Sequence, residues 1–496
     1  MSARLLSGLD IGTTGCKVCV FDPAGNLLGK VYRDYPARRS ETAHEIDAGA
    51  IWTSVQEALR EAAARFPGIA GIGVTSFGET FVALDGNDRP LAPSLLYTDP
   101  RGETECARLA QALGARRIAG ITGLNPHAMY SLPKLMWLKE NRPELYARVR
   151  RVMQMGEYVV YMLTGVAQVD YSLAARSMAF DIRALDWSRE MLAAAGVDAR
   201  LFSRPVPTGT PAGKIRPVCA ELGLSPETVV VSISHDQVAA AVGSGVLDES
   251  ATVDGAGTVE CLTPVFSEWD AGKLAAGNYC VVPFVTPGRY VTYAFSYTGG
   301  ALTQWFTERL AGYAAQKAGK SGASVYEVLE SGWNGEPTGL MVLPHFAGAA
   351  TPYMDTGSKG VIAGLTLAHT EAQVYVACME GVCYEMRLNQ ERLAAAGIRL
   401  SPLRATGGGA RSRVWLQMKA DVLNLPVTAL ETGEAGGVGS AMLVGVALGE
   451  FADLQEAART MVRVREVFQP RAAYHGKYEA IYRRYRGLYE AVRPLM

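Results

Sequence analysis

Residues 5–22 read LLSGLDIGTTGCKVCVFD: an apolar run, a Gly/Thr turn and a second apolar run. The pattern predicts a strand that ends in a carboxylate, a tight turn and a returning strand. Residues 253–262 read VDGAGTVECL and repeat this arrangement about half a chain length later. Strand and helix patterns alternate along the chain, which is typical of α/β proteins. We therefore expect two related α/β domains, residues 1–247 and 248–496.

Length, composition and charge narrow the class of protein. The chain has 496 residues, with 49% apolar and 20% charged residues and a net charge of -1. Nucleic acid and anionic membranes are therefore not expected partners. No apolar run has the length of a membrane span, and residues 1–7 lead into a strand pattern without a signal peptide. Cys16 and Cys19 should point to opposite faces of a strand, which disfavours a disulfide or a shared metal. These features predict a cytoplasmic protein.

Other segments give weaker secondary-structure signals. Helical periodicity covers residues 51–65, and residues 103–164 read mostly as helix. The chain from about residue 454 onward also reads as helical. It ends in a basic, tyrosine-rich helix over residues 474–492, which we expect to dock with its charged face in solvent.

The two Gly/Thr turns are candidate phosphate-binding sites. Glycine lets the backbone approach a phosphate, and successive N–H groups with threonine hydroxyls form an anion-binding concavity. A plain hairpin is the alternative for either turn alone, but the recurrence favours a nucleotide held between two domains. Asp10, before the first turn, can hold a hydrated Mg²⁺. The phosphate candidates are Gly12, Thr13 and Thr14 in the first turn and Gly257 and Thr258 in the second.

A further candidate follows the apolar run 229–233, where Ser234-His235-Asp236-Gln237 precedes a small-residue helix. In α/β folds, ligands usually bind at the carboxyl ends of strands. Asp236 is therefore a candidate general base that accepts a hydroxyl proton during phosphoryl transfer. The alternative is a helix N-cap. We expect His235 to be a packed neighbour rather than a catalyst.

Residues 406–412 read TGGGARS and precede a predicted helix. Three glycines at a helix start leave room for an adenine ring or a phosphate. Their entropic cost favours a binding role over a flexible loop with Ser412 as a helix cap. Gly300 and the stretch 433–439 are weaker examples. The chain lacks both G-x-x-x-x-G-K-[ST] and, at its first turn, G-x-G-x-x-G, which argues against P-loop and dinucleotide-binding folds.

Polar residues also follow two apolar runs in the first half. Glu79 comes after the predicted strand 69–75, and Asp99 and Arg101 come after residues 94–97. Carboxylates and arginines bind polyols through paired hydrogen bonds, whereas surface charge on loops is the alternative. The histidines lack metal-ligand spacing, so a zinc site is not expected.

Taken together with the two signatures quoted below, these motifs resemble those of the FGGY carbohydrate kinases, which include xylulose, gluconate, ribulose and glycerol kinases. The resemblance spans nearly the whole chain. Met129-x-Ser131-x-x-Lys134-Leu135-x-Trp137-Leu138-x-Glu140-Asn141 fits the first family signature throughout. Gly360-x-Ile362-x-Gly364-Leu365, followed by Gln373-Val374-x-x-Ala377-Cys378-Met379-Glu380, fits the second except at Cys378.

The resemblance implies two actin-like, ribonuclease-H-like ATPase domains around a central cleft that holds ATP. It implies an N-terminal sugar-binding domain and a C-terminal nucleotide-binding domain, with Asp236 as catalytic base and Asp10 serving Mg²⁺ through water. The implied nucleotide-binding residues are Gly12, Thr13, Thr14, Gly257, Thr258, Gly300, Gly409, Ala410 and Ser412. The implied sugar-binding residues are Gly78, Glu79, Asp99, Arg101 and Asp236.

The positions that choose the substrate depart from the xylulose kinase pattern. Gly78-Glu79 stands where those kinases usually have Met-His, and Tyr97 stands in place of the usual tryptophan. Glycerol kinases carry a glutamate at the matching place, preceded by arginine. A ketopentose such as xylulose is the expected substrate, and other sugars or polyols stay open. The phosphorylated hydroxyl and the oligomeric state, a homodimer included, also stay open.

Two other functions are alternatives to that of a sugar kinase. An actin-like or heat-shock-chaperone-like ATPase shares the fold plan, but the sequence has no peptide-binding module or long linker. A homologue that senses sugar without catalysis is the second, and the intact Asp10 and Asp236 argue against it.

Overall fold

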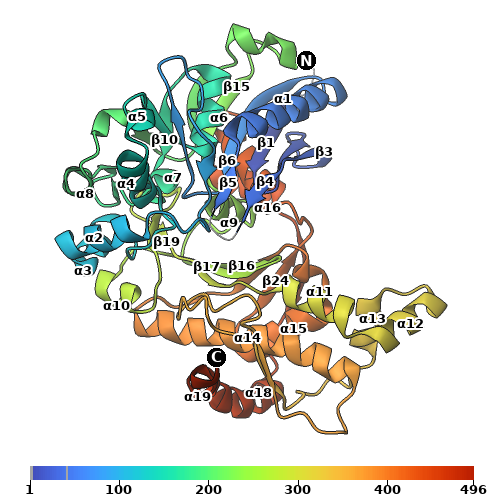
Figure 1. The fold of residues 1–496 in the computed structure, drawn as a ribbon. Helices are drawn as coiled ribbons and strands as arrows, with labels where there is room; N and C mark the ends of the chain where they lie inside the picture. The colour runs from blue at the N-terminus through green and yellow to red at the C-terminus, as the bar shows by residue number, and fades with distance from the viewer. Residues whose placement is uncertain (1–3, 41–42) are drawn as a thin grey trace. The chain divides into compact units, whose positions relative to one another are not determined.

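The computed structural model describes residues 4–40 and 43–496 (Figure 1). The expected absence of a signal peptide rests partly on residues 1–3, which lie outside the described part. The chain forms two compact units that alternate along the sequence. The first comprises Met1–Leu247, Cys280–Val291 and Glu434–Val462, and the second comprises Asp248–Tyr279, Thr292–Gly433 and Arg463–Met496. Distant segments therefore complete each unit.

The first unit is built on a six-stranded sheet with the order β14-β15-β6-β1-β2-β3. The central strands β1, β6 and β15 are parallel, and the remaining neighbours pair antiparallel. The hairpin predicted from the sequence is β1–β2, with Ile11 paired to Cys16. The strands are β1 (Leu5–Ile11), β2 (Gly15–Phe21), β3 (Leu27–Asp34), β6 (Ile69–Ser76), β14 (Thr210–Lys214) and β15 (Val229–His235).

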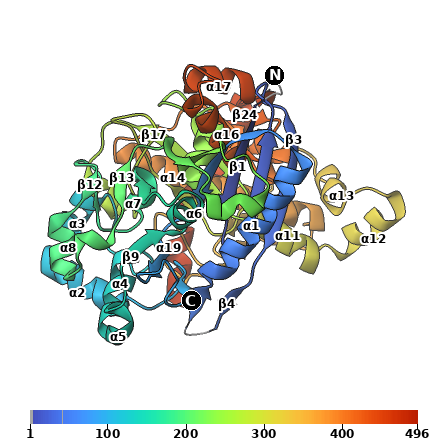
Figure 2. The same ribbon diagram turned by 90° about the horizontal axis from the view of Figure 1, so that it is seen from above.

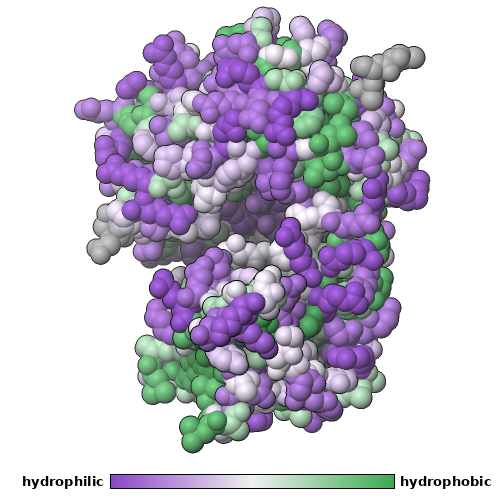
Figure 3. All heavy atoms as spheres, turned by 90° about the vertical axis from the view of Figure 1, so that its right-hand side faces the viewer, coloured by the Kyte–Doolittle hydropathy of each residue, from purple (hydrophilic) through white to green (hydrophobic). Residues whose placement is uncertain are grey.

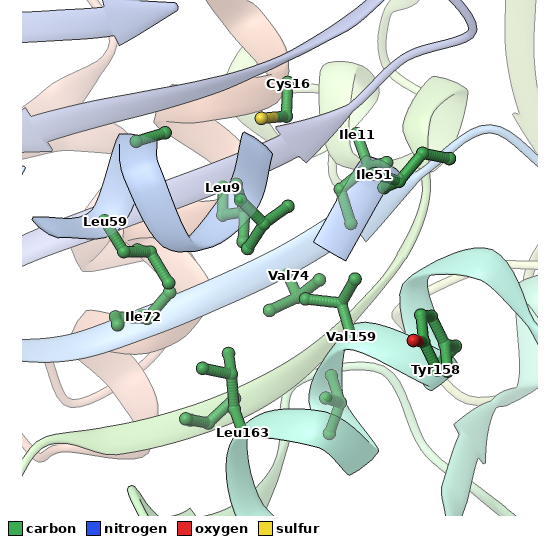
Figure 4. Packing of buried hydrophobic residues seen from close by; sticks show 14 of the residues in the cluster. Leu9, Ile11, Cys16, Ile51, Leu59, Ile72, Val74, Tyr158, Val159 and Leu163 are labelled. Carbon is green, nitrogen blue, oxygen red and sulfur yellow. The ribbon is translucent and has the colours of Figure 1, made fainter. Parts of the chain in front are cut away.

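Successive side chains of β1 point to opposite faces of the sheet. On one face Leu9 and Ile11 join a buried core with Ile51 of α1 (Ala48–Arg65) and Val159 of α6 (Met155–Thr164), as Figure 4 shows. Figure 2 shows α1 lying along β1 and β3. Burial of this apolar face is the main stabilising contribution to the unit. It fixes the direction in which the end of β1 presents Asp10.

The opposite face of the sheet is covered by α16 (Ala435–Ala447), which packs very closely. A Cβ on Gly8 would lie 2.7 Å from the Gly437 carbonyl oxygen, and a Cβ on Gly439 would lie 2.0 Å from the Ala239 carbonyl oxygen in α9 (Asp236–Gly243). In the sequence, the stretch 433–439 is a weak candidate for nucleotide binding. Gly437 and Gly439 of this stretch permit the close packing of α16 on the sheet and on α9.

The second unit repeats the pairing pattern of the first. Its strands run in the order β20-β17-β16-β23-β24-β25. Counted from the ends β3 and β20, both sheets show two antiparallel pairings, two parallel pairings and a final antiparallel one. The shared topology agrees with the duplication that the two Gly/Thr hairpins predict. The strands are β16 (Thr252–Ala256), β17 (Glu260–Phe266), β20 (Ala294–Ser296), β23 (Leu403–Thr406), β24 (Val427–Leu430) and β25 (Val464–Phe468).

Helices of the second unit pack in a layer beside this sheet. Figure 1 shows the long helix α14 (Glu371–Ala395) running beneath β16 and β17, with α18 (Ala472–Tyr485) beyond it. Tyr478, Tyr482 and Tyr485 of α18 are buried against α14, which confirms a docked, tyrosine-rich helix. The prediction of a single helix over residues 474–492 is wrong in extent. The helix is interrupted at Gly487, so that α18 is followed by a second helix, α19 (Leu488–Val492).

One other secondary-structure prediction needs correction. The segment after residue 454 is not wholly helical, because β25 follows α17 (Leu454–Met461) and completes the sheet edge. There a neighbouring strand overrides the local helical pattern.

Residues 103–164 are mostly helical, as predicted. The helices are α2 (Glu103–Leu113), α3 (Ala115–Thr122), α4 (Ser131–Asn141), α5 (Pro143–Tyr146) and α6. One strand lies among them, β9 (Arg151–Gln154), which pairs with β7 (Phe81–Leu84).

The surface carries mixed hydrophilic and hydrophobic residues. On the face drawn in Figure 3, green hydrophobic patches are separated by purple hydrophilic residues. Across residues 4–40 and 43–496, no helix combines the length and the apolar character needed to cross a bilayer.

Candidate functional site

The first Gly/Thr turn leaves its polar groups open. The Gly12 N–H donates to the Gly15 carbonyl at 2.9 Å, and the Tyr35 hydroxyl donates to the Gly12 carbonyl at 2.5 Å. These bonds hold the turn, yet the side-chain hydroxyls of Thr13 and Thr14 have no hydrogen-bond partner among the described residues. Both hydroxyls are therefore free to meet an added anion.

Asp10 lies at the end of β1, on the face covered by α16. Its neighbour Lys17 donates to Glu434 at 2.7 Å, so this lysine is engaged elsewhere. Burial raises the pKa of the Asp10 carboxyl, with Lys17 opposing the rise and Glu434 adding to it. No hydrogen bond to the Asp10 carboxyl occurs among the described residues, so it keeps acceptor capacity for a hydrated cation.

Asp236 is the first residue of α9, directly after β15. His235, rather than Asp236, is the N-cap residue, so the N-cap alternative for Asp236 is wrong. The strand end is fixed because the His235 N–H donates to the Ser172 hydroxyl at 2.9 Å and the Thr75 hydroxyl donates to the Ser234 carbonyl at 2.7 Å. The Asp236 side chain is 36% exposed. It is thus held by rigid elements but remains reachable.

Burial, together with two nearby carboxylates, makes Asp236 a proton acceptor near neutral pH. Burial raises its pKa to about 7, and the carboxylates of Asp10 and Glu79 contribute to the rise. The Nε2 of His235 lies 3.3 Å from Asp236 Oδ1. Burial, and then Arg176, holds the pKa of His235 well below its usual range, so the ring stays neutral. A carboxyl group poised in this way suits general-base catalysis.

Glu79 is buried and bound to an arginine that the sequence did not single out. Arg176 donates through Nε to Glu79 Oε1 at 2.6 Å, and its Nη2 contacts the same oxygen. The Ser131 hydroxyl donates to the Glu79 carbonyl at 2.7 Å. Glu79 has φ of 66°, a left-handed conformation that is rare outside glycine and often marks functional sites.

A local signal for Arg176 does exist in the sequence. It is the one charged residue in the run SLAARSMAF, residues 172–180. A charge inside an otherwise small and apolar run predicts a buried ion pair. The partner, however, lies 97 positions away, and no local pattern identifies it.

Asp99 and Arg101 bind each other rather than Glu79. Arg101 donates to both Asp99 carboxylate oxygens, at 2.8 Å from Nε and 2.6 Å from Nη2, and also to Glu45 at 2.7 Å. The Asp99 side chain is 0% exposed. Lys134 donates to the Asp99 carbonyl at 2.6 Å, and burial lowers its pKa to about 8. This pair therefore shapes the loop beside the site.

The carboxylates of Glu79 and Asp236 influence Tyr97, which precedes the Asp99–Arg101 pair. Burial raises the pKa of Tyr97, and Glu79 and Asp236 both add to the rise. The structure thus brings Tyr97, Glu79 and Asp236 together, while Gly78 lies against Arg176 and His235.

The second unit contains a cavity of about 810 Å³. Of the residues predicted to bind nucleotide there, Gly257, Thr258, Gly300, Gly409 and Ser412 line it. Ala410 is buried beside it and accepts a hydrogen bond from Arg465 through its carbonyl at 2.6 Å. Tyr326 and Tyr375 supply aromatic rings to the wall, 6.4 Å apart. Glycine backbone at one end and rings at another suit phosphates and a flat base.

Ser412 has a structural role at this cavity as well. Its hydroxyl accepts from the Trp415 N–H at 3.1 Å, which caps α15 (Arg413–Leu423), and donates to Glu330 at 2.8 Å. Ser412 is therefore a helix cap, as the alternative interpretation predicted. Because Ser412 also lines the cavity, the start of α15 lies at the cavity wall.

The duplicated aspartates have different surroundings. Asp254 occupies in β16 the place that Asp10 occupies in β1. Lys419 donates to Asp254 at 2.7 Å and contacts Glu260, and all three side chains are at most 2% exposed. Although burial opposes it, the two carboxylates raise the pKa of Lys419. Of the two aspartates, only Asp254 thus has a lysine hydrogen-bonded to its carboxylate.

Within the described residues, no group of three or more histidine, cysteine, aspartate or glutamate side chains could cage a metal ion. All eight cysteines are buried free thiols. The donor set at Asp10, one open carboxylate beside free threonine hydroxyls, fits Mg²⁺, which usually keeps waters and shares its coordination with substrate phosphates.

Comparison with known proteins gives a consistent result. The sequence model of the N-terminal domain of the FGGY family of carbohydrate kinases matches residues 5–243, and that of the C-terminal domain matches residues 257–448. The chain is 27% identical to the xylulose kinase of Bacillus subtilis, covering 99% of this chain and 98% of the relative. It is 30% identical to the glycerol kinase of Bordetella parapertussis, covering 91% and 90%.

The fold also matches a solved structure. A crystal structure described as a xyloylose kinase from Brucella ovis superposes with a TM-score of 0.87 at 26% identity, covering 99% of this chain and 100% of that one. The similar proteins carry different substrate names, so they leave the acceptor sugar open.

Proposed function

Because the chain belongs to the FGGY family of carbohydrate kinases, which are ATP-dependent, we propose that it phosphorylates a ketopentose such as xylulose with Asp236 as general base. The observation that carries the proposal is the cluster of Asp236, Glu79 and Asp10, in which Asp236 is poised to change protonation near pH 7. A sugar hydroxyl becomes a nucleophile only as it loses its proton, and a carboxylate of this kind accepts that proton.

In the proposed reaction the substrate hydroxyl oxygen forms a bond to the γ-phosphorus of ATP. The bond between that phosphorus and the β,γ-bridging oxygen breaks, and ADP leaves. The hydroxyl proton moves to an Asp236 carboxylate oxygen and then to solvent. Asp236 is held by the β15–α9 junction, so little reorganisation is needed as the proton is transferred.

The nucleotide binds, in this proposal, in the cavity of the second unit. Gly257 and Thr258 face its phosphates, and Tyr326 and Tyr375 lie where the base would stack. Asp10 and the hydroxyls of Thr13 and Thr14 would hold the hydrated Mg²⁺ and the terminal phosphates. When bound, the ion supplies positive charge that neutralises the phosphates.

The sugar is proposed to meet Glu79, Tyr97 and Asp236. The Asp99–Arg101 pair supports the neighbouring loop, and its contacts to Glu45 and Trp137 leave it at the edge of this group. Both residues are also candidate sugar contacts, because they lie two and four positions after Tyr97.

A coupled assay of ADP release tests the proposal. The full-length protein is supplied with ATP and Mg²⁺ and with a panel of pentuloses, polyols and aldonates. We expect ADP release that depends on one substrate class. Asp236→Ala should lower kcat by about 10²–10⁴-fold while nucleotide binding persists. Sugar-independent ADP release would instead support an ATPase, and sugar binding without turnover would support a sensor.

A further inference from the structure

The strand that leads to Asp236 has an irregular end. Val74 of β6 pairs with Ser232 of β15, and the next pairing joins Ser76 to His235. β15 therefore advances three positions where β6 advances two, which is the pattern of a β-bulge with one extra residue. Bulges bend a strand and change the direction of its side chains, and they are common beside active sites. This bulge lies directly before the proposed general base.

Side-chain hydroxyls bond the peptide group between Ser234 and His235 at both of its ends. The Thr75 hydroxyl donates to the Ser234 carbonyl at 2.7 Å, and the Ser172 hydroxyl accepts from the His235 N–H at 2.9 Å. All four residues are at most 6% exposed, so an unpaired backbone group here would be costly. We call Thr75 and Ser172 the hydroxyl clamp, because they hold the last peptide group before that of Asp236.

Asp170 fixes the direction of the Ser172 hydroxyl. That hydroxyl donates to an Asp170 carboxylate oxygen at 2.9 Å, so towards the His235 N–H its oxygen can only accept. Asp170 is the N-cap residue of α7 (Tyr171–Ala175) and accepts from the Ser172 and Leu173 N–H groups at 3.0 and 2.8 Å. It also accepts from the Thr208 hydroxyl and is 1% exposed. Several donors therefore hold the carboxylate that orients the clamp.

A matched hydrogen bond lies at the other end of the same two strands. The Thr228 hydroxyl donates to the Ile69 carbonyl of β6 at 2.9 Å, and Thr228 is 1% exposed. Thr75 and Thr228 are thus both buried threonines whose hydroxyls donate to a backbone carbonyl across the β6–β15 pair. Thr228 precedes the start of β15, whereas Asp236 follows its end. Both bonds should contribute to stability, but only that of Thr75 can affect the position of Asp236.

We infer that the hydroxyl clamp, oriented by Asp170, positions the Asp236 carboxylate for proton transfer. Thr75, Ser172 and Asp170 are positioning residues, because they act through the backbone that carries Asp236. A misplacement of a reacting group by about 1 Å can lower a rate about a hundredfold. This inference rests on the proposed kinase function and deepens it, since it assigns the residues that hold the general base in place.

Thr75→Val and Thr228→Val test the clamp as a matched pair. Valine has nearly the shape of threonine but no hydroxyl, so each variant loses one buried hydrogen bond and both should have a lower Tm. We expect kcat for sugar-dependent ADP release to fall at least about tenfold in Thr75→Val and less than about twofold in Thr228→Val. KM for the sugar should change less than about twofold in both, because neither hydroxyl is a proposed ligand contact. Equal kcat values in the two variants would overturn the inference.

Ser172→Ala tests the other half of the clamp. It removes the acceptor of the His235 N–H and should lower kcat at least about tenfold, again with little change in KM. Ser172→Thr keeps the hydroxyl and should retain most of the activity. Asp170→Asn should lower kcat in the same direction, because an amide nitrogen cannot accept from Ser172. Wild-type kcat in Ser172→Ala would contradict the proposal.

The design separates failure of the clamp from failure of the kinase function. Each kcat is expressed per molecule that binds a non-hydrolysable ATP analogue, so partial unfolding cannot imitate a loss of catalysis. If Asp236→Ala keeps its activity, the general base itself is wrong. If Asp236→Ala is inactive while Thr75→Val and Ser172→Ala have full kcat, only the clamp is wrong. Should one clamp variant fail to fold, as judged by circular dichroism, the other decides.

Discussion

At the scale of single residues, the chemistry depends on which carboxylates are left open. Asp10 and Glu79 both add to the raised pKa of Asp236, and Asp236 Oδ1 accepts no hydrogen bond among the described residues. Asp254 is chemically equivalent to Asp10 in the sequence but is neutralised by Lys419. The same residue type at the same topological place thus serves two purposes, because a lysine reaches only one of them.

The pH dependence of activity should report Asp236. Its pKa is raised to about 7, so the basic form is lost as pH falls below that value. We expect kcat/KM to fall roughly tenfold per pH unit below about pH 7. Removing the negative charge of Glu79 should lower the pKa of Asp236, so the acid limb of the profile for Glu79→Gln should move to lower pH. An acid limb that stays in place would show that Glu79 does not act on the titrating group.

At the scale of elements, buried charges hold the second Gly/Thr hairpin. Lys419 on α15 bridges Asp254 of β16 and Glu260 of β17 on either side of the turn. The Gly299 N–H then donates to the Thr258 carbonyl at 3.0 Å, and Gly300 to Gly257 at 2.8 Å. The triad therefore fixes the turn against the start of α11 (Gly300–Arg309).

Breaking this triad should be costly. Lys419→Met leaves two buried carboxylates without a cation, which typically destabilises a protein by about 3–5 kcal/mol. We expect that loss in the free energy of unfolding, measured by urea denaturation. Adding Asp254→Asn and Glu260→Gln should recover much of it. Lys477→Met, in an exposed pair with Glu336, should cost no more than about 1 kcal/mol. Similar losses for the two lysines would disprove the special role of the triad.

Close backbone packing at the cavity gives a second prediction for elements. A Cβ on Gly300 would lie 2.7 Å from the Gly257 carbonyl oxygen, so Gly300→Ala must push the hairpin away from α11. We expect the KM for ATP to rise at least about tenfold, with a smaller change in kcat. Gly312→Ala is the control, because a methyl group at that position would meet no other atom within 4 Å. An unchanged KM for ATP in Gly300→Ala would argue against nucleotide binding at this turn.

At the scale of the whole molecule, two units with the same strand pairings carry different sites. The carboxylate cluster comes from residues of the first unit, and the lining of the 810 Å³ cavity comes from the second. The return of Glu434–Val462 to the first unit completes its sheet packing, since α16 covers β1. The two units thus have sheets of the same topology, and different side chains form the carboxylate cluster of one and the cavity lining of the other.

Separate construction of the two sites has a measurable consequence. Substitutions at the proposed sugar-binding residues of the first unit should leave binding of a non-hydrolysable ATP analogue unchanged, whereas substitutions in the cavity of the second unit should weaken it. Isothermal titration calorimetry should give binding free energies for wild type and Glu79→Gln that agree within about 0.5 kcal/mol. Gly300→Ala should bind the analogue with a larger Kd. The double variant should show the sum of both effects. A large change in Kd caused by Glu79→Gln would refute this independence.

The sequence by itself determined the features that depend on neighbours along the chain. Alternating apolar residues and Gly/Thr turns defined the β1–β2 and β16–β17 hairpins, and the apolar run 229–233 was readable as a strand that ends just before Asp236. Short-range backbone preferences and side-chain alternation decide such elements, so they are legible in a window of a few residues.

Only the tertiary structure decided which charges meet. Arg176 reaches Glu79 across 97 positions, and Lys419 reaches Asp254 across 165. Gly437 and Gly439 became packing contacts because α16 returns to the first unit, and β25 pairs with β24 as the edge strand where a helix was predicted. Contacts between distant segments follow from the path of the whole chain, and local propensity carries no information about that path.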